Sequence, residues 1–339
     1  MTNNASPLIV NVYRGNIVES SHLVHAIVMD RAGDVVESWG DVERPTYPRS
    51  SLKALQALPF VESGAVDAFG LGDAEIALAC ASHNAEQVHI EKVTVWLEKV
   101  GLDAKALLCG GHLSINQDRA HEMIRNGETL TALYSDCSGK HAGMVTTAVH
   151  QGHPIVNYTD PNHPVQRQIL QTISEMADYD LTQRPPGIDG CSAPNPALPL
   201  KNIALAFSRF MNLKTLPSDR AVACGRILDA IAANPYMIGG KARFDTVLIE
   251  SSGGNLLSKL GAEGNCLAFV RDQGLTIYLK AEDGIPERAT LPVLSALLNR
   301  HKAMDDRTDK AVEHFTRPVL KNWRGLEVGK ITVPDLLSL

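Results

Sequence analysis

The feature that most constrains the fold is a change in hydrophobic periodicity, close to residue 50 and again close to residue 245. Outside these two points, short apolar and β-branched runs bounded by Gly and Asp predict strands. Between them, apolar residues recur at helical spacing, and the segments stop at Gly or Pro. The predicted strands cover residues 8–13, 23–29, 35–39, 245–250, 266–270 and 275–280.

Strands from both ends of the chain that enclose a helical middle predict one antiparallel sheet made from both termini. We therefore expect a mixed α+β fold with helices packed on the sheet. The sheet subdomain comprises about residues 1–49 and 236–339, and the inserted helical subdomain about residues 50–235. Together they form a single domain over residues 1–339.

Composition and charge exclude several classes of function. The net charge is −6 and 44 % of the 339 residues are hydrophobic, so a large core is expected and a basic nucleic-acid groove is not. No run reaches the ~18 apolar residues of a membrane span, and the N-terminus lacks the Lys or Arg of a secretory signal. We expect a cytoplasmic protein with reduced thiols that binds neither nucleic acid nor membrane.

The segment Arg49-Ser50-Ser51-Leu52-Lys53 contains the pattern S-x-x-K. Ser50 and Lys53 lie three residues apart, so in the first turn of a helix they share a face. A serine hydroxyl is a weak nucleophile that needs a base within hydrogen-bond reach, and a neutral lysine can be that base. This spacing alone is common and predicts little.

Two further motifs strengthen this interpretation. Ser82-His83-Asn84 is S-x-N, and Lys259-Leu260-Gly261 is K-x-G near the start of the C-terminal strands. The three motifs occur in the same order in serine enzymes that recognise penicillin. Ser82 could instead be the neighbour of a helix cap, and Lys259 could be a solvated strand end. The shared order favours the catalytic interpretation.

The six cysteines form no C-x-x-C pair, which excludes zinc ribbons and thioredoxin-type motifs. Cys137 and Cys191 lie in polar, Gly-rich loops, whereas the other four have the surroundings of small hydrophobic residues. The pair could be a metal site, a nucleophile with a spare thiol, or structural thiols. Spacing alone favours structural thiols first and a metal second, with Lys140 or His141 as the third ligand. The other four are Cys80, Cys109, Cys224 and Cys266.

Four segments of this chain resemble the rhizobial-type (class 3) L-asparaginases: residues 48–53, 134–143, 189–194 and 322–329. The resemblance covers essentially the whole chain in order, and the two cysteine loops are its most distinctive parts. It implies a serine-β-lactamase-like fold and a homodimer. It also implies hydrolysis of L-asparagine to L-aspartate and ammonia.

The same resemblance implies roles for four residues in catalysis. Ser50 is the nucleophile with Lys53 beside it, and Ser82 pairs with a lysine of the C-terminal strands. We assign that lysine to Lys259 from the K-x-G motif. Two alternatives stay open at this point: a glutaminase or other β-lactamase-like serine hydrolase, and a non-catalytic protein that binds zinc or an amino acid. The intact serine–lysine set speaks against the second.

The resemblance also implies a zinc ion next to the catalytic residues, held by Cys137, Lys140 and Cys191. Lys140 must be neutral to bind it, because an ammonium has no lone pair. Three further residues are expected to bind the substrate, namely Arg49, His141 and Asp189.

Overall fold

The computed structural model describes residues 2–4 and 6–336. The chain forms two units. The first comprises Met1–Ser51, Leu198–Asn212 and Val247–Leu339, and the second comprises Leu52–Ala197 and Leu213–Thr246. The interpretation of the chain as a single domain stays a prediction.

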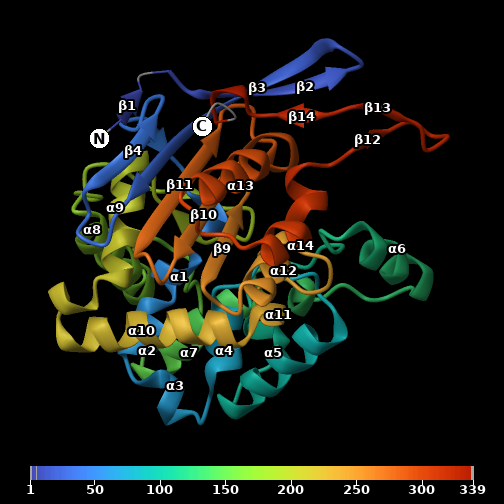
Figure 1. Ribbon diagram of the computed structural model, residues 1–339. Helices are drawn as coiled ribbons and strands as arrows, with labels where there is room; N and C mark the ends of the chain where they lie inside the picture. Colours follow the sequence, from blue (N-terminus) through green and yellow to red (C-terminus); the bar gives the residue numbers. More distant parts are fainter. Residues whose placement is uncertain (1, 5, 337–339) are drawn as a thin grey trace. The chain divides into compact units, whose positions relative to one another are not determined.

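An eight-stranded sheet built from both ends of the chain organises the first unit. Its strands are β1 (Thr2–Asn4), β2 (Leu8–Arg14), β3 (Ile17–Met29), β4 (Val35–Trp39), β9 (Leu256–Gly261), β10 (Asn265–Val270), β11 (Leu275–Ala281) and β14 (Ile331–Thr332). The strand order is β1-β4-β3-β11-β10-β9, and β2 pairs with both β3 and β14. Figure 1 shows β9, β10 and β11 side by side.

The two ends of the chain meet where β3 runs antiparallel to β11, with Ala26 opposite Leu279. All pairings in this sheet are antiparallel except that of β1 with β4, within the described residues. This confirms the predicted mixed α+β class and the antiparallel sheet made from both termini. Nearly every residue of β9, β10 and β11 is buried, which explains their continuous apolar runs.

Helices of the first unit pack on this sheet. They are α9 (Leu200–Met211), α13 (Leu291–Arg300) and α14 (Asp306–Thr316). Phe207 and Phe210 of α9 contact Phe269 of β10, with ring centroids 5.8 and 6.4 Å apart. Two short strand pairs complete the unit, namely β5 (Pro45–Thr46) with β8 (Leu198–Pro199) and β12 (Leu320–Lys321) with β13 (Glu327–Gly329).

The strand predicted over residues 245–250 is wrong, because this segment is helix α12 (Phe244–Ser251). Leu248 and Ile249 are both fully buried, so the segment lacks the alternation that marks a half-buried strand. A short apolar run is compatible with either a buried helix or a buried strand.

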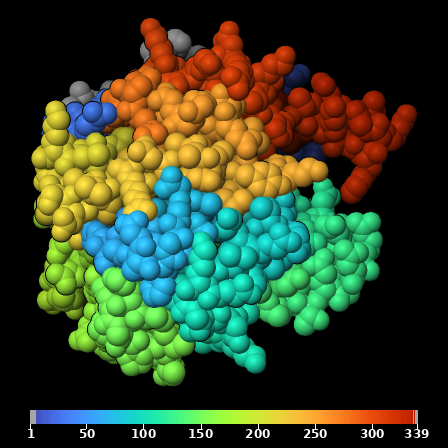
Figure 2. Space-filling view, turned by 90° about the horizontal axis from the view of Figure 1, so that it is seen from below, coloured from blue at the N-terminus to red at the C-terminus, as the bar shows by residue number. Residues whose placement is uncertain are grey.

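The second unit is mainly helical. Its helices are α1 (Lys53–Gln56), α2 (Leu58–Glu62), α3 (Ala65–Ala68), α4 (Asp73–Ala79), α5 (Gln87–Lys99), α6 (Gln117–Asn126), α7 (Ser138–His150), α8 (Pro164–Ala177), α10 (Ser218–Ala233) and α11 (Pro235–Ile238). Helix α5 buries Val93, Trp96 and Leu97 at helical spacing. Phe60 of α2 stacks on Trp96, and Figure 2 shows the blue chain of α2 and α3 beside the turquoise chain of α5.

Helix α7 carries much of the candidate site and is buried along most of its length. Its first residues are small, which lets it approach α4 closely. A Cβ on Gly139 would lie 2.3 Å from the carbonyl oxygen of Leu78, so only glycine fits at this crossing. The contact fixes the first turn of α7, which holds Lys140 and His141.

All six cysteines are buried thiols that form no disulfide. Burial raises the pKa of Cys109 to about 11 and that of Cys224 to about 12, as expected for unreactive core thiols.

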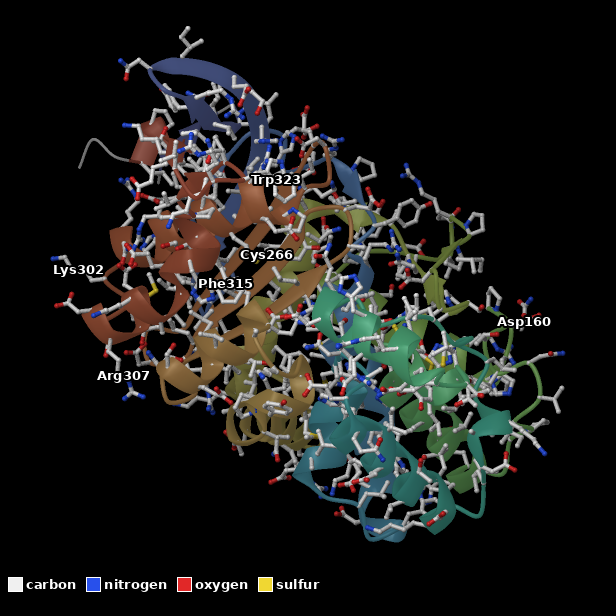
Figure 3. The ribbon with its side chains drawn as sticks, turned by 90° about the vertical axis from the view of Figure 1, so that its right-hand side faces the viewer. Asp160, Cys266, Lys302, Arg307, Phe315 and Trp323 are labelled. Atoms are coloured by element: carbon white, nitrogen blue, oxygen red, sulfur yellow. The ribbon has the colours of Figure 1, made fainter. Side chains whose placement is uncertain are left out.

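Figure 3 shows Cys266 on β10 and Trp323 between β12 and β13, where the indole is fully exposed. Among residues 2–4 and 6–336, no helix combines the length and hydropathy that crossing a membrane requires.

Candidate active site

Lys53, the lysine of the S-x-x-K motif, begins α1 and has a completely buried side chain. Its ammonium donates to the hydroxyl of Ser82 over 2.9 Å and to the carbonyl oxygen of Ala81. The carboxylate oxygen Oδ2 of Asp136 lies 3.8 Å from Nζ. A buried ammonium is tolerated only when it is hydrogen-bonded and paired with a negative charge, and these three groups meet that need.

The loop that carries Ser82 is fixed by backbone hydrogen bonds to the chain after α11. The Ser82 N–H donates to the carbonyl oxygen of Ile238 over 3.0 Å, and the Asn84 N–H donates to that of Gly239 over 2.9 Å. The side-chain amide of Asn84 donates to the carbonyl oxygen of Lys241 over 3.0 Å. The Asn of the S-x-N motif therefore holds the loop in place, and Ser82 points its hydroxyl at Lys53.

Asp136 is the counter-charge of this group, and sequence analysis did not identify it. Burial raises the pKa of its carboxyl, but the Lys53 ammonium and the hydrogen bond from His112 outweigh burial and hold the pKa well below its usual range. His112 Nε2 lies 3.3 Å from Oδ1 of Asp136 and accepts the backbone N–H of Asp136 over 3.2 Å, and Nδ1 donates to the carbonyl oxygen of Leu113 over 2.7 Å. The hydrogen bond to Asp136 raises the pKa of His112, whose side chain is 41 % exposed. The Asp136 carboxylate thus connects the buried amine of Lys53 to the partly exposed ring of His112.

Ser50, Arg49 and Lys259 belong to the first unit. Ser50 is half-buried in the 3-10 turn Arg49–Leu52, and Arg49 has a positive φ of 53°. Lys259 is nearly buried on β9, where its amine donates to the carbonyl oxygen of Leu260 over 2.8 Å. A Cβ on Gly261 would lie 2.7 Å from the carbonyl oxygen of Pro48. The glycine of the K-x-G motif therefore lets the end of β9 lie against the turn that carries Ser50.

A second group of buried side chains gathers at the start of α7. Cys137 immediately precedes the helix, and Lys140 lies in its first turn. Cys191 lies in the loop between β6 (Gly187–Ile188) and β7 (Pro194–Asn195). That loop turns tightly because Ser192 has a left-handed backbone, with a φ of 71°. The Lys140 amine donates to Cys191 Sγ over 3.0 Å, and all three side chains are at most 5 % exposed.

The two thiols differ in charge. The hydrogen bond from the Cys137 thiol lowers the pKa of Cys191, and the Lys140 ammonium lowers it further against the effect of burial. The same hydrogen bond, together with burial, raises the pKa of Cys137. Burial lowers the pKa of Lys140, but the Cys191 thiolate outweighs burial and raises it. The group is therefore a thiolate–ammonium pair to which a neutral thiol donates.

The donor set of this group fits a thiophilic metal such as zinc. Within the part of the chain that the structure describes, no three side chains among His, Cys, Asp and Glu are placed to hold a metal ion. A metal here would therefore need the nitrogen of Lys140 besides the sulfur atoms of Cys137 and Cys191. The contacts among these three side chains make that combination possible, because they already converge in a buried space.

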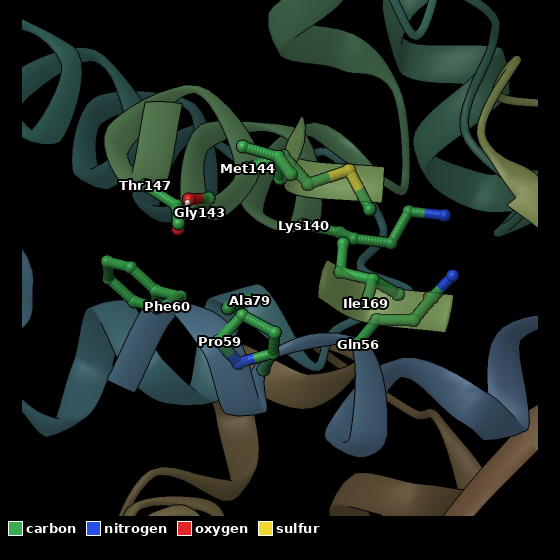
Figure 4. Close-up of a pocket in the computed structure, with 11 residues that line it drawn as sticks. Gln56, Pro59, Phe60, Ala79, Lys140, Gly143, Met144, Thr147 and Ile169 are labelled. Carbon is green, nitrogen blue, oxygen red and sulfur yellow. Dashed lines mark hydrogen bonds between the residues drawn. The ribbon is translucent and has the colours of Figure 1, made fainter. Parts of the chain in front are cut away.

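The apolar stem of Lys140 explains how the amine reaches the thiols. It lines a small pocket together with Phe60, Ala79 and Ile169. Figure 4 shows the amine end pointing away from Phe60 and Thr147. The methylene groups are covered by apolar side chains, and the buried charged end is paired with Cys191.

His141 and Asp189, which the family resemblance implies as substrate-binding residues, interact with members of the thiol group. His141 is fully buried, and its Nδ1 lies 2.6 Å from the hydroxyl of Tyr158. Asp189 is half-buried, and its charge contributes to the raised pKa of Lys140. That either residue binds a substrate stays a prediction.

The two groups of the second unit are directly connected. Asp136 and Cys137 are consecutive, and the backbone N–H of His83 donates to the carbonyl oxygen of Asp136 over 3.3 Å. His83 Nε2 also lies 2.9 Å from the hydroxyl of Ser138. The chain from Ser82 to His83 thus ties the lysine–serine contact to the start of α7. Sequence analysis missed His83 and Asp136, although a lysine expected to be buried already implied an acidic partner.

Comparison with known proteins gives one family. A family model described as L-asparaginase II matches residues 10–333. No protein in the curated collection matches.

Three solved structures resemble the chain at low identity. A putative β-lactamase from Bacteroides dorei DSM 17855 covers 82 % of this chain and 92 % of its own, with 13 % identity and a TM-score of 0.47. The β-lactamase Mb2281c from Mycobacterium bovis covers 83 % and 95 %, with 11 % identity and a TM-score of 0.43. A mutant of the simvastatin synthase LovD from Aspergillus terreus covers 86 % and 90 %, with 8 % identity and a TM-score of 0.39.

Proposed function

Because the chain belongs to the L-asparaginase II family and is thus an amidohydrolase, we propose that it hydrolyses the side-chain amide of L-asparagine through a serine–lysine mechanism. The observation that supports this mechanism is the buried amine of Lys53, which donates to the Ser82 hydroxyl over 2.9 Å and faces Asp136. Core packing alone would favour an apolar residue at position 53. A lysine buried there therefore supports a chemical role for its amine.

The proposed reaction begins with Lys53, which must lose a proton before it can accept one. That proton leaves to solvent on the side of Asp136 and His112, and Asp136 itself stays a carboxylate. The neutral amine then accepts the hydroxyl proton of Ser50, three residues before it in the chain, while Ser50 Oγ bonds to the amide carbon of asparagine. The C–N bond breaks as the nitrogen receives a proton and leaves as ammonia.

Ser82, for which we predict Lys259 as a partner, relays the proton to the departing nitrogen. Water then attacks the aspartyl ester of Ser50. L-Aspartate leaves, and a proton of the attacking water passes to Ser50 Oγ. Backbone N–H groups at the start of the first turn would stabilise the oxyanion, as helix starts do in other hydrolases.

The proposed zinc site consists of Cys137, Lys140 and Cys191. When bound, zinc supplies a fixed positive charge for orienting the α-carboxylate and α-amino groups of the substrate. Arg49, Asp189 and His141 are the side chains proposed to contact these groups. We also propose that the protein is a homodimer, as the family resemblance implies. We further propose that it works in the cytoplasm, because a reducing compartment keeps both thiols available.

Replacement of Ser50 by Ala tests the mechanism. Ammonia release from L-asparagine should fall on the order of 10³-fold or more, because the nucleophile is lost. Wild-type protein quenched during turnover should carry an aspartyl ester on Ser50, detectable by peptide mass spectrometry. Near wild-type turnover by Ser50→Ala would exclude the covalent route.

The matched control is the neighbouring serine. Ser51 is fully buried and its hydroxyl contacts the carbonyl oxygen of Pro48 and the hydroxyl of Tyr278, so its role is structural. Ser51→Ala should lower stability but retain turnover.

Glutamine and a chromogenic β-lactam, assayed beside asparagine, separate asparaginase activity from the two related hydrolase activities. Sedimentation velocity of the purified protein tests the homodimer.

A further inference from the structure

Arg119, in the first turn of α6, has a side chain that is only 11 % exposed, and the mechanism above gives it no role. Its Nε–H donates to the carbonyl oxygen of Ala85 over 3.1 Å. Nη1 and Nη2 donate to the two carboxylate oxygens of Glu128, each over 2.7 Å. The Asn116 side chain caps the helix by accepting the backbone N–H of Arg119 over 3.0 Å. Both ends of Arg119 are therefore fixed, and its Nε–H points at the loop that carries Ser82.

Ala85 has an unfavourable backbone conformation. Its φ is +53°, in the left-handed region that alanine avoids because Cβ comes too close to the following carbonyl oxygen. Such a conformation persists only where the surrounding structure enforces it. Ala85 is fully buried and lies three residues after Ser82 in the chain. The strain therefore lies in the loop that presents the Ser82 hydroxyl to Lys53.

Two hydrogen bonds hold Ala85 in this conformation. Its N–H donates to Nδ1 of His83 over 3.1 Å, which is a contact inside the loop. Its carbonyl oxygen accepts from the Arg119 guanidinium, which is a contact from outside the loop. The backbone N–H groups of Ser82 and Asn84 are bonded to the chain after α11. Without Arg119, the carbonyl group of Ala85 would lose its charged donor, and the backbone could rotate to relieve the strain.

Helix α6 belongs to a segment whose two ends lie together. A Cβ on Gly111 would lie 2.4 Å from the carbonyl oxygen of Thr131, so only glycine allows the two chains to approach there. His112 directly follows this close approach, and its ring contacts Asp136. The segment is therefore anchored near the buried lysine at its start, and Arg119 is its contact with the serine loop.

We propose that Arg119 is a positioning residue that holds Ala85 in its left-handed conformation and thereby keeps the Ser82 hydroxyl in place. The expected effect on turnover rests on the proposed function, whereas the effect on the loop does not. Arginine suits this role because its planar guanidinium can bind both oxygens of Glu128 while Nε–H serves a third acceptor. A lysine has no such rigid fork of donors.

Hydrogen exchange followed by mass spectrometry tests the effect on the loop without any substrate. Arg119→Met should raise the exchange rate of the amides in residues 82–86 about 10-fold, because the loop opens more often. The same replacement in the Ala85→Gly background should raise it less than about 3-fold, since glycine adopts a positive φ without strain. An unchanged rate in Arg119→Met, or equal increases in both backgrounds, would overturn the proposal.

Ammonia release from L-asparagine tests the effect on turnover. Arg119→Met should lower kcat about 10- to 100-fold, because a small displacement of a catalytic group is enough for such a loss. KM should change little, since Arg119 is not expected to touch the substrate. In the Ala85→Gly background most of the loss in kcat should disappear, and a loss of the same size there would contradict the proposed role. If the wild-type protein releases no ammonia, the proposed function fails, while the exchange rates still decide whether Arg119 holds the loop.

Arg220→Met is the matched control for the loss of an arginine with two carboxylate partners. The Arg220 side chain is 16 % exposed and pairs with Glu62 and Glu175 in the same unit, in surroundings as buried as those of Arg119. Its replacement should lower the urea midpoint about as much as Arg119→Met does, but leave kcat and the exchange of residues 82–86 unchanged. If Arg220→Met slows turnover as much as Arg119→Met, general loss of stability explains both and the proposal is overturned.

Discussion

Replacement of Asp136 by Asn removes the negative charge that faces Lys53 while preserving the shape of the side chain. The Lys53 amine is fully buried, and its Nζ lies 3.8 Å from Oδ2. Two unit charges at this separation attract by about 4 kcal/mol at an effective dielectric constant of ~20. Breaking a buried pair by removing one partner costs about 3–5 kcal/mol. Because the Asp136 side chain is 20 % exposed, we expect about 3 kcal/mol.

Urea unfolding at pH 7 measures this cost as a lower midpoint with an unchanged slope. Asp67→Asn is the matched control, because Asp67 pairs with Arg226 in the same unit but its side chain is 70 % exposed. Such a surface pair contributes only about 0–1 kcal/mol. Lys53→Met combined with Asp136→Asn should recover much of the loss, because it leaves no unpaired buried charge. The reasoning is refuted if Asp136→Asn costs no more than Asp67→Asn.

The pH dependence of this cost has a defined sign. The folded-state pKa of Asp136 is lowered well below that of the unfolded chain, which is about 4. The stabilisation is therefore complete above pH ~5 and is lost as the pH falls through the folded-state pKa. The difference in unfolding free energy between wild type and Asp136→Asn should close in acid, and it should also decrease as the pH rises through the folded-state pKa of His112, which Asp136 raises.

Two further predictions concern the start of α7. Gly139→Ala should cost about 2 kcal/mol or more in unfolding free energy, because its Cβ would meet the Leu78 carbonyl oxygen at 2.3 Å. Gly143→Ala is the control within the same helix, since its Cβ would meet its nearest neighbour at an ordinary 3.5 Å, and it should be neutral or stabilising. Zinc binding should release about two protons, from Lys140 and Cys137, because both have raised pKa values and the second thiol is already ionised. Calorimetry in buffers of different ionisation enthalpy counts them, and release of no protons would contradict this charge assignment.

The sheet could be predicted from the sequence because its strands are marked by short β-branched runs between turn residues. Strands at both ends of a chain that surround helices favour one shared sheet, which predicted a sheet made from both termini, whereas the pairing of β3 with β11 was not predicted. Helix α12 was misassigned because Leu248 and Ile249 are both buried, and a continuous apolar run carries no period. Only the packing of the folded chain distinguishes a buried helix from a buried strand in this segment.

The thiol group was predictable in part. The polar loops identified Cys137 and Cys191 as different from the other cysteines, and Lys140 was named as a third member. Tyr158 was not identified, because a tyrosine in a loop has no pattern that reveals a hydrogen bond to a distant histidine. Asp136 was not identified as the counter-charge of Lys53, although it directly precedes Cys137 in the sequence.

Counting donors explains a contact of Ser82 that motif order did not predict, namely the one with Lys53. An ammonium carries three hydrogens, and burial of Lys53 forces each to find an acceptor. Ala81 and Ser82 accept two of them, and the Asp136 carboxylate lies 3.8 Å from the nitrogen. The contact of Ser82 with Lys53 thus follows from the burial of α1, a tertiary property that the S-x-x-K spacing does not contain. Pairing of Ser82 with Lys259 stays a prediction, and it would have to coexist with this contact, because a serine hydroxyl can accept from one amine while it donates to another.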